Sequence, residues 1–252
     1  ACGMIGTYVV CRRLVFLSGG ITHASFGGIG MAYYFGANPL LGALLFAVLS
    51  ALGIETFTAR KQIREDSAIG LLWSLGMAIG IIFIYLTPGY APNLMSFLFG
   101  NILSVTGTDI FWMGVVDLAI LLIFGTMYHP ILFVAFDREY ARSQNFPTRT
   151  ISYLMATLVA VTIVISIRVV GIVLLISLLT IPAVIGNLIS KSFGRILLYG
   201  SVIAALSAFA GLYISYQTNI PSGASTIFVL TVTLIAVKTI TFVRLKRRMK
   251  TR

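Results

Sequence analysis

The sequence predicts an all-α fold, a polytopic membrane helical bundle of about nine transmembrane helices that forms one domain over residues 1–252. Two observations lead to this prediction. First, 58% of the residues are hydrophobic, only 10% are charged, and the mean hydropathy is +1.00. A soluble domain usually has about a quarter of its residues charged. Second, long apolar runs alternate with short charged or Gly/Pro-containing breaks, so lipid is the expected solvent.

The basic residues predict the number and direction of the crossings. The chain carries 18 Lys and Arg against seven Asp and Glu, a net charge of +11. Small basic clusters between apolar runs are typical of cytoplasmic membrane loops, and they do not form the basic face of a nucleic-acid-binding protein. We therefore expect a lipid bilayer and no nucleic acid as partner. Seventeen of the 18 form five clusters: Arg12 and Arg13; Arg60, Lys61 and Arg64; Arg138, Arg142 and Arg149; Lys191 and Arg195; and seven between Lys238 and Arg252.

Clusters on one side of a membrane are separated by an even number of spans. Three of the intervals are about 40 residues long, which fits two helices of roughly 20 residues each. They are residues 14–59 with a turn at Asn38-Pro39, residues 150–190 with Arg168 near the tip, and residues 196–237 with an outer loop at 217–223.

The remaining interval, 65–137, is longer and is expected to hold two spans and a short helix. Its apolar runs at 67–86 and from about 110 to 136 are long enough to cross, and His129-Pro130 interrupts the second of them. The run at 94–105 would form only about 18 Å of helix, so we interpret it as a re-entrant or outer-surface helix.

The two ends of the chain complete the count. We expect the apolar run before Arg12 to be a truncated first span, and residues from about 225 to 243 to be the last span. The total is nine, with the amino end outside and the basic carboxyl end inside.

His23 is the first candidate functional residue because it is an ionisable side chain within a predicted span. Such groups are costly in a bilayer and often mark function. Small residues at 20, 24, 27 and 28 would let another backbone approach this helix closely. We interpret His23 as a transition-metal ligand through its neutral imidazole, the alternative being a histidine hydrogen-bonded to a neighbouring helix.

Asp117 is the second candidate, a carboxylate inside a later span. It is either an oxygen ligand in an aqueous pathway or a structural carboxylate, paired for example with Arg168. The other carboxylates have simpler explanations. Glu65 and Asp66 stand at a helix start, where they satisfy free amide groups and the helix dipole, and Glu55 is interpreted similarly, as a local structural charge.

Two cytoplasmic loops are the expected docking surfaces for a partner, the alternative being solvated loops without one. Charges in the segment 137–143 are spaced for a short helix with one exposed face, and the second loop, 187–194, follows Pro182. The candidate docking residues are Asp137, Arg138, Glu139, Arg142, Lys191 and Arg195.

The sequence contains no catalytic constellation. No HExxH, GxSxG or GxxxxGK[ST] motif occurs, and Cys2 and Cys11 lie in the first apolar run without nearby metal ligands. We therefore expect no enzyme and no tightly bound cofactor. Any energy source is an ion gradient or a separate protein.

Four stretches of the sequence together identify a family. They are Arg12-Arg13-Leu14-Val15-Phe16-Leu17 leading into His23-Ala24; Arg64-Glu65-Asp66-Ser67-Ala68-Ile69-Gly70; Phe97-Leu98-Phe99-Gly100-Asn101-Ile102-Leu103 followed by Phe136-Asp137-Arg138-Glu139-Tyr140-Ala141; and Arg168-Val169-Val170-Gly171-Ile172-Val173-Leu174-Leu175 running on to Ile181-Pro182-Ala183. In this order they resemble the permease subunits of bacterial ABC importers for zinc and manganese. The resemblance covers nearly the whole chain.

The resemblance implies a permease in the bacterial inner membrane. Two copies would form a central pathway, two cytoplasmic ABC ATPase subunits would drive alternating access, and an extracytoplasmic metal-binding protein would deliver the metal. The family's pathway site pairs a histidine, matched by His23, with an Asp four residues earlier, where this chain has Gly19. Because nitrogen ligands favour zinc or iron over manganese, we expect zinc as the transported substrate, with Asp117 as a replacement ligand.

The competing function is an ATP-independent transporter or channel driven by an ion gradient. It predicts transport without an ATPase partner, and co-purification with an ATPase would separate the two. A membrane-embedded enzyme would need a pair of close acids or a Ser/His pair, neither of which is visible. A non-transporting scaffold would not need His23 or Asp117.

Overall fold

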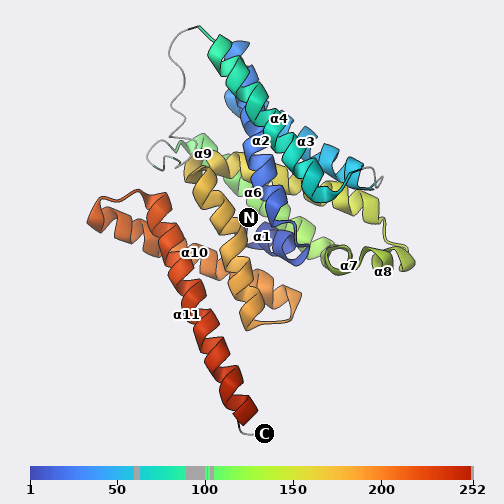
Figure 1. Ribbon diagram of the computed structural model, residues 1–252, viewed down its shortest axis with the longest axis vertical. Coiled ribbons are helices and arrows are strands. Elements are labelled where there is room, and N and C mark those ends of the chain that lie inside the picture. Colours follow the sequence, from blue (N-terminus) through green and yellow to red (C-terminus); the bar gives the residue numbers. More distant parts are fainter. Residues whose placement is uncertain (60–62, 89–99, 101, 103–104, 251–252) are drawn as a thin grey trace. The chain divides into compact units, whose positions relative to one another are not determined.

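The computed structural model of the chain describes residues 1–59, 63–88, 100, 102 and 105–250 (Figure 1). Throughout these residues the regular structure is helical and contains no strand, so the predicted all-α class is confirmed. The chain divides into two compact units. We call Leu14–Ile172 the central unit and Ala1–Arg13 with Val173–Arg252 the terminal unit.

The described residues of the central unit form six helices and the first part of a seventh. They are α2 (Val15–Tyr34), α3 (Pro39–Ala59), α4 (Glu65–Leu86), α6 (Gly107–Thr126), α7 (Tyr128–Phe136), α8 (Arg138–Ser143) and the beginning of α9 (Thr148–Ile189). The terminal unit contains α1 (Cys2–Cys11), the rest of α9, α10 (Phe193–Thr218) and α11 (Ser222–Lys250).

Six helices are long and apolar enough to cross a bilayer, which confirms a multi-pass membrane protein. Among the described residues these are α3, α4, α6, α9, α10 and the Ser222–Val243 part of α11, while α1 is a shorter apolar helix. Much of their surface is apolar and exposed, as lipid contact requires. On α6, for example, the exposed side chains include Ile110, Phe111, Trp112, Leu118, Leu121 and Leu122.

The helix α9 has a kink close to Arg168, near the position where the sequence predicts a turn. It is continuous in sequence from Thr148 to Ile189, but Gly171 interrupts it with φ 76° and ψ 164°. A residue with a Cβ rarely adopts this conformation, so the glycine fixes where the bend occurs. Gly100, which also has a positive φ, lies against this bend, and a Cβ built on it would be 2.6 Å from the amide nitrogen of Gly171.

The predicted span from about 110 to 136 is two helices in the structure. α6 ends at Thr126, Met127 has φ −111° and ψ 27°, and α7 begins at Tyr128. The break precedes Pro130 because a continuous helix would need an amide hydrogen from residue 130 to the carbonyl of Thr126, and proline has none. Most of the short helix predicted at 94–105 lies outside the described residues.

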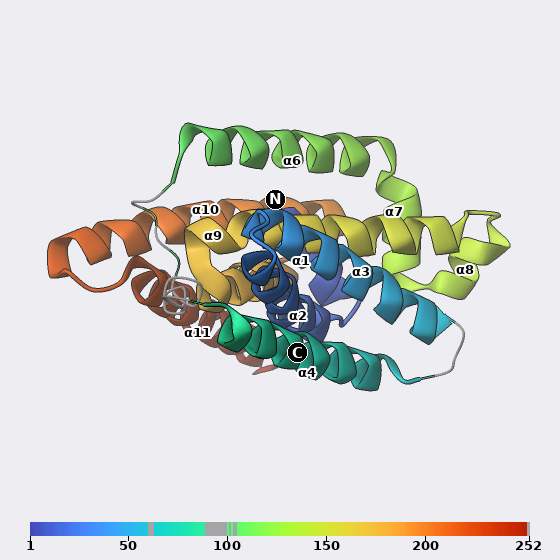
Figure 2. The same ribbon diagram turned by 90° about the horizontal axis from the view of Figure 1, so that it is seen from above.

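Glycines set the packing of α2, which lies alongside α3 and α4 in both views of the central unit (Figures 1 and 2). A Cβ at Gly28 would overlap the carbonyl oxygen of Gly42 on α3. On the other side, a Cβ at Gly76 of α4 would lie 2.6 Å from the Cα of Ala24. The predicted close approach of another backbone to this part of α2 is therefore confirmed, and it involves two helices.

Glycines also lie at close backbone contacts in the terminal unit. Gly6 of α1 meets the carbonyl oxygen of Leu179 in α9, and Gly3 meets the backbone of Ser201 in α10. Gly211 of α10 meets the backbone of Thr226 in α11. Close backbone contacts of this kind maximise van der Waals attraction where lipid provides no hydrophobic drive for helices to associate.

Candidate functional site

His23 lies on α2 and is half-buried beside α4. Its imidazole stacks on the indole of Trp73, with ring centroids 4.4 Å apart and planes 6° from parallel. Stacking covers one face of the imidazole, whereas the lone pair of a ring nitrogen lies in the ring plane. The contact therefore fixes the orientation of His23 without occupying the atoms that would bind a metal.

Trp73 is a residue that the sequence analysis did not single out. It lies on α4 between Ile69 and Gly76, and both of these neighbours contact the glycine-rich part of α2. Positions 69, 73, 76 and 80 fall on one face of a helix, since three- and four-residue steps align side chains. That spacing was the available signal that Trp73 would face His23.

The hydroxyl groups beside His23 on α2 already donate hydrogen bonds within their own helix. Thr22 donates to the carbonyl of Ser18 at 2.6 Å, and Ser25 donates to that of Thr22 at 2.7 Å. Gly19, at the position of the family's aspartate, is buried and offers no side chain. His23 is consequently the only side chain of α2 with an imidazole or carboxylate group.

A metal-binding cluster is not formed within the part of the chain that the structure describes. No group of three or more His, Cys, Asp or Glu side chains there is close enough to hold an ion. Asp117, the predicted second ligand, is exposed on α6 between apolar side chains such as Leu118 and Leu121. A site with His23 therefore needs water or a second molecule to complete its coordination.

Arg168 binds a different carboxylate from the one suggested by the sequence. Its guanidinium donates to Asp109 at 2.8 Å. Asp109 belongs to a capping box at the start of α6, where it accepts hydrogen bonds from the amide and hydroxyl of Thr106 at 2.9 and 2.7 Å. The pair joins the start of α6 to the segment of α9 just before the bend at Gly171.

The first predicted docking segment forms the helix α8. Asp137 caps it by accepting hydrogen bonds from the amides of Glu139 and Tyr140, both at 3.0 Å. Glu139 and Arg142 form an exposed ion pair at 3.6 Å, three residues apart. The predicted short helix is confirmed, and these two charges lie on its exposed face.

Arg138 differs from the other charges of this segment because it points inward. Its guanidinium pairs with Glu55 at the end of α3 and donates to the hydroxyl of Ser152 in α9 at 2.8 Å. The Glu55 side chain is 8% exposed and that of Arg138 is 32% exposed. Glu55 is thus a long-range structural charge and not a locally paired one, and the pair joins α8 to α3 and α9.

Aromatic rings support α8 from one side. Phe133 of α7 lies 5.3 Å from the ring of Tyr140 and 5.8 Å from that of Phe146. His129, in the first turn of α7, is exposed and contacts Tyr128 edge-on at 5.3 Å. His129 is therefore an exposed side chain beside an aromatic ring, and not an interior one.

The second predicted docking segment joins α9 to α10. Lys191 and Arg195 are both exposed there, and the amide of Ser192 donates to the hydroxyl of Ser190 at 3.2 Å. This short turn therefore presents two positive charges to its surroundings.

Six helices that can cross a bilayer, together with a half-buried histidine between helices, fit the membrane subunit of a transporter. The family model of the ABC 3 transport family matches residues 1–241, and this chain belongs to that family. It is accordingly a multi-pass permease subunit of a metal-type ABC transporter in the inner membrane, it is not an enzyme, and the ATPase is a separate subunit.

The relatives agree with this assignment. The chain is 38% identical over 227 residues to the "Probable metal transport system membrane protein" of Chlamydia pneumoniae, covering 88% of this chain and 78% of that one. It is 34% identical over 228 residues to the manganese transport system membrane protein MntC of Halalkalibacterium halodurans, covering 90% and 78%. A solved structure of PsaBC from Streptococcus pneumoniae in complex with Fab matches 94% of this chain and 85% of its own, with 28% identity and a TM-score of 0.82.

Proposed function

We propose that this chain imports divalent transition-metal ions through a pathway in which His23 is the metal ligand. The observation that carries the proposal is the placement of His23, a half-buried imidazole held by stacking on Trp73 in the helix α2, which packs closely against α3 and α4. A neutral imidazole binds zinc, iron and manganese ions but has little affinity for alkali metals. The chain as a whole, residues 1–252, would act as one permease domain.

Zinc is our proposed substrate because His23 offers nitrogen and Gly19 offers no carboxylate. Manganese is the competing substrate, and a relative named as a manganese transport protein favours it. Manganese prefers oxygen ligands, so it would require Asp117 or water to supply them. A direct competition experiment, in which each metal inhibits uptake of the other, would distinguish the two candidate substrates.

A second copy of the chain would complete the site. One His23 from each copy, related by a two-fold axis, would supply two nitrogens, which one chain does not. We propose a homodimer with two ATPase subunits on the cytoplasmic side and an extracytoplasmic metal-binding protein on the other. The exposed charges Glu139, Arg142, Lys191 and Arg195 are the proposed ATPase contacts, with Asp137 and Arg138 shaping α8.

We further propose nine crossings with the carboxyl end in the cytoplasm. The bend at Gly171 would divide α9 into two crossings, and α1 and α2 would add to the other five long helices. The orientation rests on the basic clusters, which would all lie on the cytoplasmic side.

The test is metal uptake by vesicles that contain the permease with its ATPase and binding protein. His23→Ala should lower zinc uptake at least tenfold, and His129→Ala, which removes the exposed histidine of α7, should leave it within twofold. Unchanged zinc uptake in His23→Ala would remove His23 from the pathway. If unlabelled manganese displaces zinc more effectively than zinc itself, manganese is the substrate and the ligand argument for zinc fails.

The docking proposal has its own measurement, the stimulation of ATP hydrolysis by the permease. Arg142→Glu and Arg195→Glu should each weaken this stimulation, whereas Arg64→Glu, at an exposed helix start, serves as the control for charge reversal. If neither docking variant differs from the control, the docking surface lies elsewhere. Uptake that proceeds without any ATPase would favour a gradient-driven transporter instead.

A further inference from the structure

The imidazole of His23 makes no hydrogen bond to any other residue that the structure describes, and its ring contact there is the stack on Trp73. A histidine that binds a metal almost always donates its second ring N–H to a carboxylate, a carbonyl or a water, and this hydrogen bond holds the ring in place. In the described part of this chain, the only group that holds the His23 ring is therefore an aromatic face.

Close contacts on both sides keep the two stacked rings opposite each other. A Cβ built on Gly20 would lie 2.4 Å from the Cγ2 of Ile69, and a Cβ built on Gly76 would lie 2.6 Å from the Cα of Ala24. Gly20 and Ala24 stand on either side of the histidine on α2, and Ile69 and Gly76 stand on either side of the tryptophan on α4. Contacts this close leave α2 and α4 little freedom to slide along each other, so the rings stay in register.

We propose that Trp73 is a positioning residue for metal binding by His23. The indole would hold the imidazole by its face, so that a ring nitrogen is presented to the metal in one direction, and Trp73 itself would not touch the metal. This inference rests on the proposed function, since it takes His23 as the metal ligand. A ring that is already held loses less freedom when it binds. A bound cation also withdraws electrons from the imidazole, which strengthens its stacking on the electron-rich indole.

The competing explanation is that Trp73 only fills space between α2 and α4. Phe26 provides the comparison, because it is also an aromatic residue of this interface. It is 7% exposed, and a Cβ built on Gly80 of α4 would lie 2.5 Å from its Cδ1. Among the described ring contacts it makes none with His23. Substitution of each aromatic residue by leucine therefore separates packing of the interface from positioning of the imidazole.

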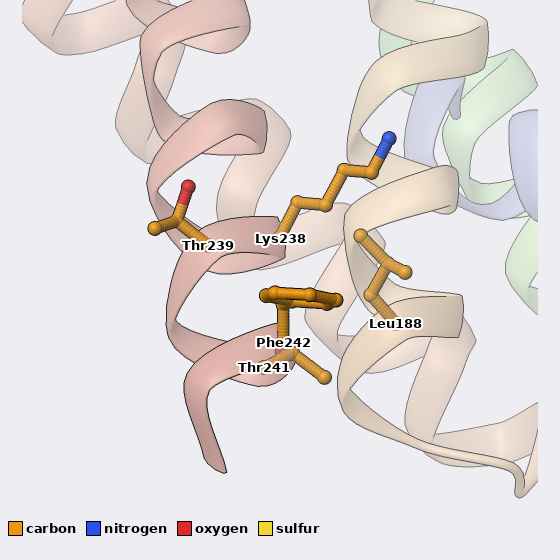
Figure 3. Close-up of a pocket in the computed structure, with 5 residues that line it drawn as sticks. All are labelled: Leu188, Lys238, Thr239, Thr241 and Phe242. Atoms are coloured by element: carbon orange, nitrogen blue, oxygen red, sulfur yellow. The ribbon is translucent and has the colours of Figure 1, made fainter. Parts of the chain in front are cut away.

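A hollow in the terminal unit does not compete for the metal. It has a volume of about 380 Å³ (Figure 3). Its lining consists of Leu188, Lys238, Thr239, Thr241 and Phe242. These side chains include no imidazole, thiolate or carboxylate, which are the groups that bind transition metals. Zinc bound by the chain is therefore not expected at this hollow.

The first experiment measures zinc binding to the full chain, purified with its ATPase in detergent, by equilibrium dialysis. His23→Ala defines the binding that does not depend on this histidine. Trp73→Leu should weaken the His23-dependent binding about fivefold, because the ring is no longer held. Trp73→Phe should weaken it less than about twofold, since a phenyl ring can also stack. Phe26→Leu should lower the temperature of thermal unfolding but change zinc binding less than about twofold.

The second experiment uses the fluorescence of Trp73 in the full chain. The chain has two tryptophans, and Trp112 is exposed on α6, so Trp112→Phe leaves Trp73 as the single tryptophan of the permease. Cobalt(II), which quenches indole fluorescence at short range, should quench Trp73 in a saturable manner. Excess zinc should reverse the quenching, and His23→Ala should abolish it. Packing alone would not place a metal beside this indole.

The role of Trp73 is wrong if Trp73→Leu binds zinc as the unchanged chain does, or if Trp73→Phe loses as much affinity as Trp73→Leu. It is also wrong if Phe26→Leu loses as much affinity as Trp73→Leu, or if cobalt leaves the fluorescence of Trp73 unchanged. Full zinc binding in His23→Ala would overturn the proposed function, and the role of Trp73 with it. Lost binding in His23→Ala together with normal binding in Trp73→Leu would overturn the role of Trp73 alone.

Discussion

The central and terminal units differ in the balance between acidic and basic residues, although glycines allow close helix packing in both. In the central unit seven basic residues stand against seven acidic ones, and ion pairs join distant segments, as Glu55 joins Arg138 and Asp109 joins Arg168. The terminal unit has 11 basic residues and no acidic residue in its own sequence. The net charge of +11 is therefore a property of one unit and not of the molecule as a whole.

The two units also differ in the functional features that they contain. The unit with internally balanced charge contains His23, its stacking partner Trp73 and the capped helix α8. The ion pair of Glu55 with Arg138 joins α8 to α3. The terminal unit has no acidic residue in its own sequence to form such a pair. Electrostatic variants should accordingly act through folding in the central unit and through binding in the terminal unit.

The largest expected effect tests the close helix packing at glycines, which occurs in both units. Gly28→Leu would place a side chain where the backbone of Gly42 already lies, so α2 and α3 would have to separate. We expect a loss of more than about 3 kcal/mol in the free energy of unfolding and little folded protein. The measurement is thermal unfolding in detergent, with Gly114→Ala on α6 as the control, since nothing lies within 4 Å of a Cβ there. A folded Gly28→Leu variant with unchanged stability would contradict this packing.

The next effect tests the charge balance. Glu55→Gln would leave the half-buried guanidinium of Arg138 with the hydroxyl of Ser152 but without its carboxylate. We expect about 2 kcal/mol of destabilisation, less than for a fully buried pair because Arg138 is 32% exposed. The double variant Glu55→Gln with Arg138→Met should recover part of the loss. If the double variant is as unstable as the sum of both single variants, the two side chains do not interact energetically.

A third prediction concerns the point where the two units meet in the sequence. The central unit ends at Ile172, one residue after the bend at Gly171. Gly171→Ala would place a Cβ at φ 76°, which should cost about 1–3 kcal/mol. Gly125→Ala, in open space on α6, should cost nothing measurable in the same unfolding assay. Equal stability of both variants would mean that α9 can straighten through Gly171.

Local sequence signals predicted the fold better than they predicted the contacts. Apolar run length predicted the six helices that are long enough to cross a bilayer, Asn38-Pro39 predicted the turn between α2 and α3, and Arg168 marked the bend in α9. Proline at 130 predicted a break but not its position, because the effect of a missing amide hydrogen appears four residues earlier.

For the site, the sequence predicted which residue types matter but not which residues are in contact. His23 could be selected from its type and position, but its contact with Trp73 depends on how α2 and α4 align. Likewise, nothing local distinguishes Asp109 from Asp117 as the partner of Arg168. Glu55 and Arg138 are 83 residues apart, and only the fold brings them together.

The smallest predicted effect is at the pair that joins α6 to α9. Asp109→Asn keeps an oxygen that can accept the hydrogen bonds from Thr106 but removes the charge that holds Arg168. The Arg168 side chain is 49% exposed, so we expect no more than about 1 kcal/mol of destabilisation, and less at high salt because counterions screen the pair.

Thermal unfolding at low and high salt would measure this, with Glu139→Gln on the exposed face of α8 as the control. In the control the change should be close to zero at both salt concentrations. If Asp109→Asn behaves like the control, the ion pair of Asp109 with Arg168 does not stabilise the central unit. The contrast between the units would then rest on the buried pair of Glu55 and Arg138 alone.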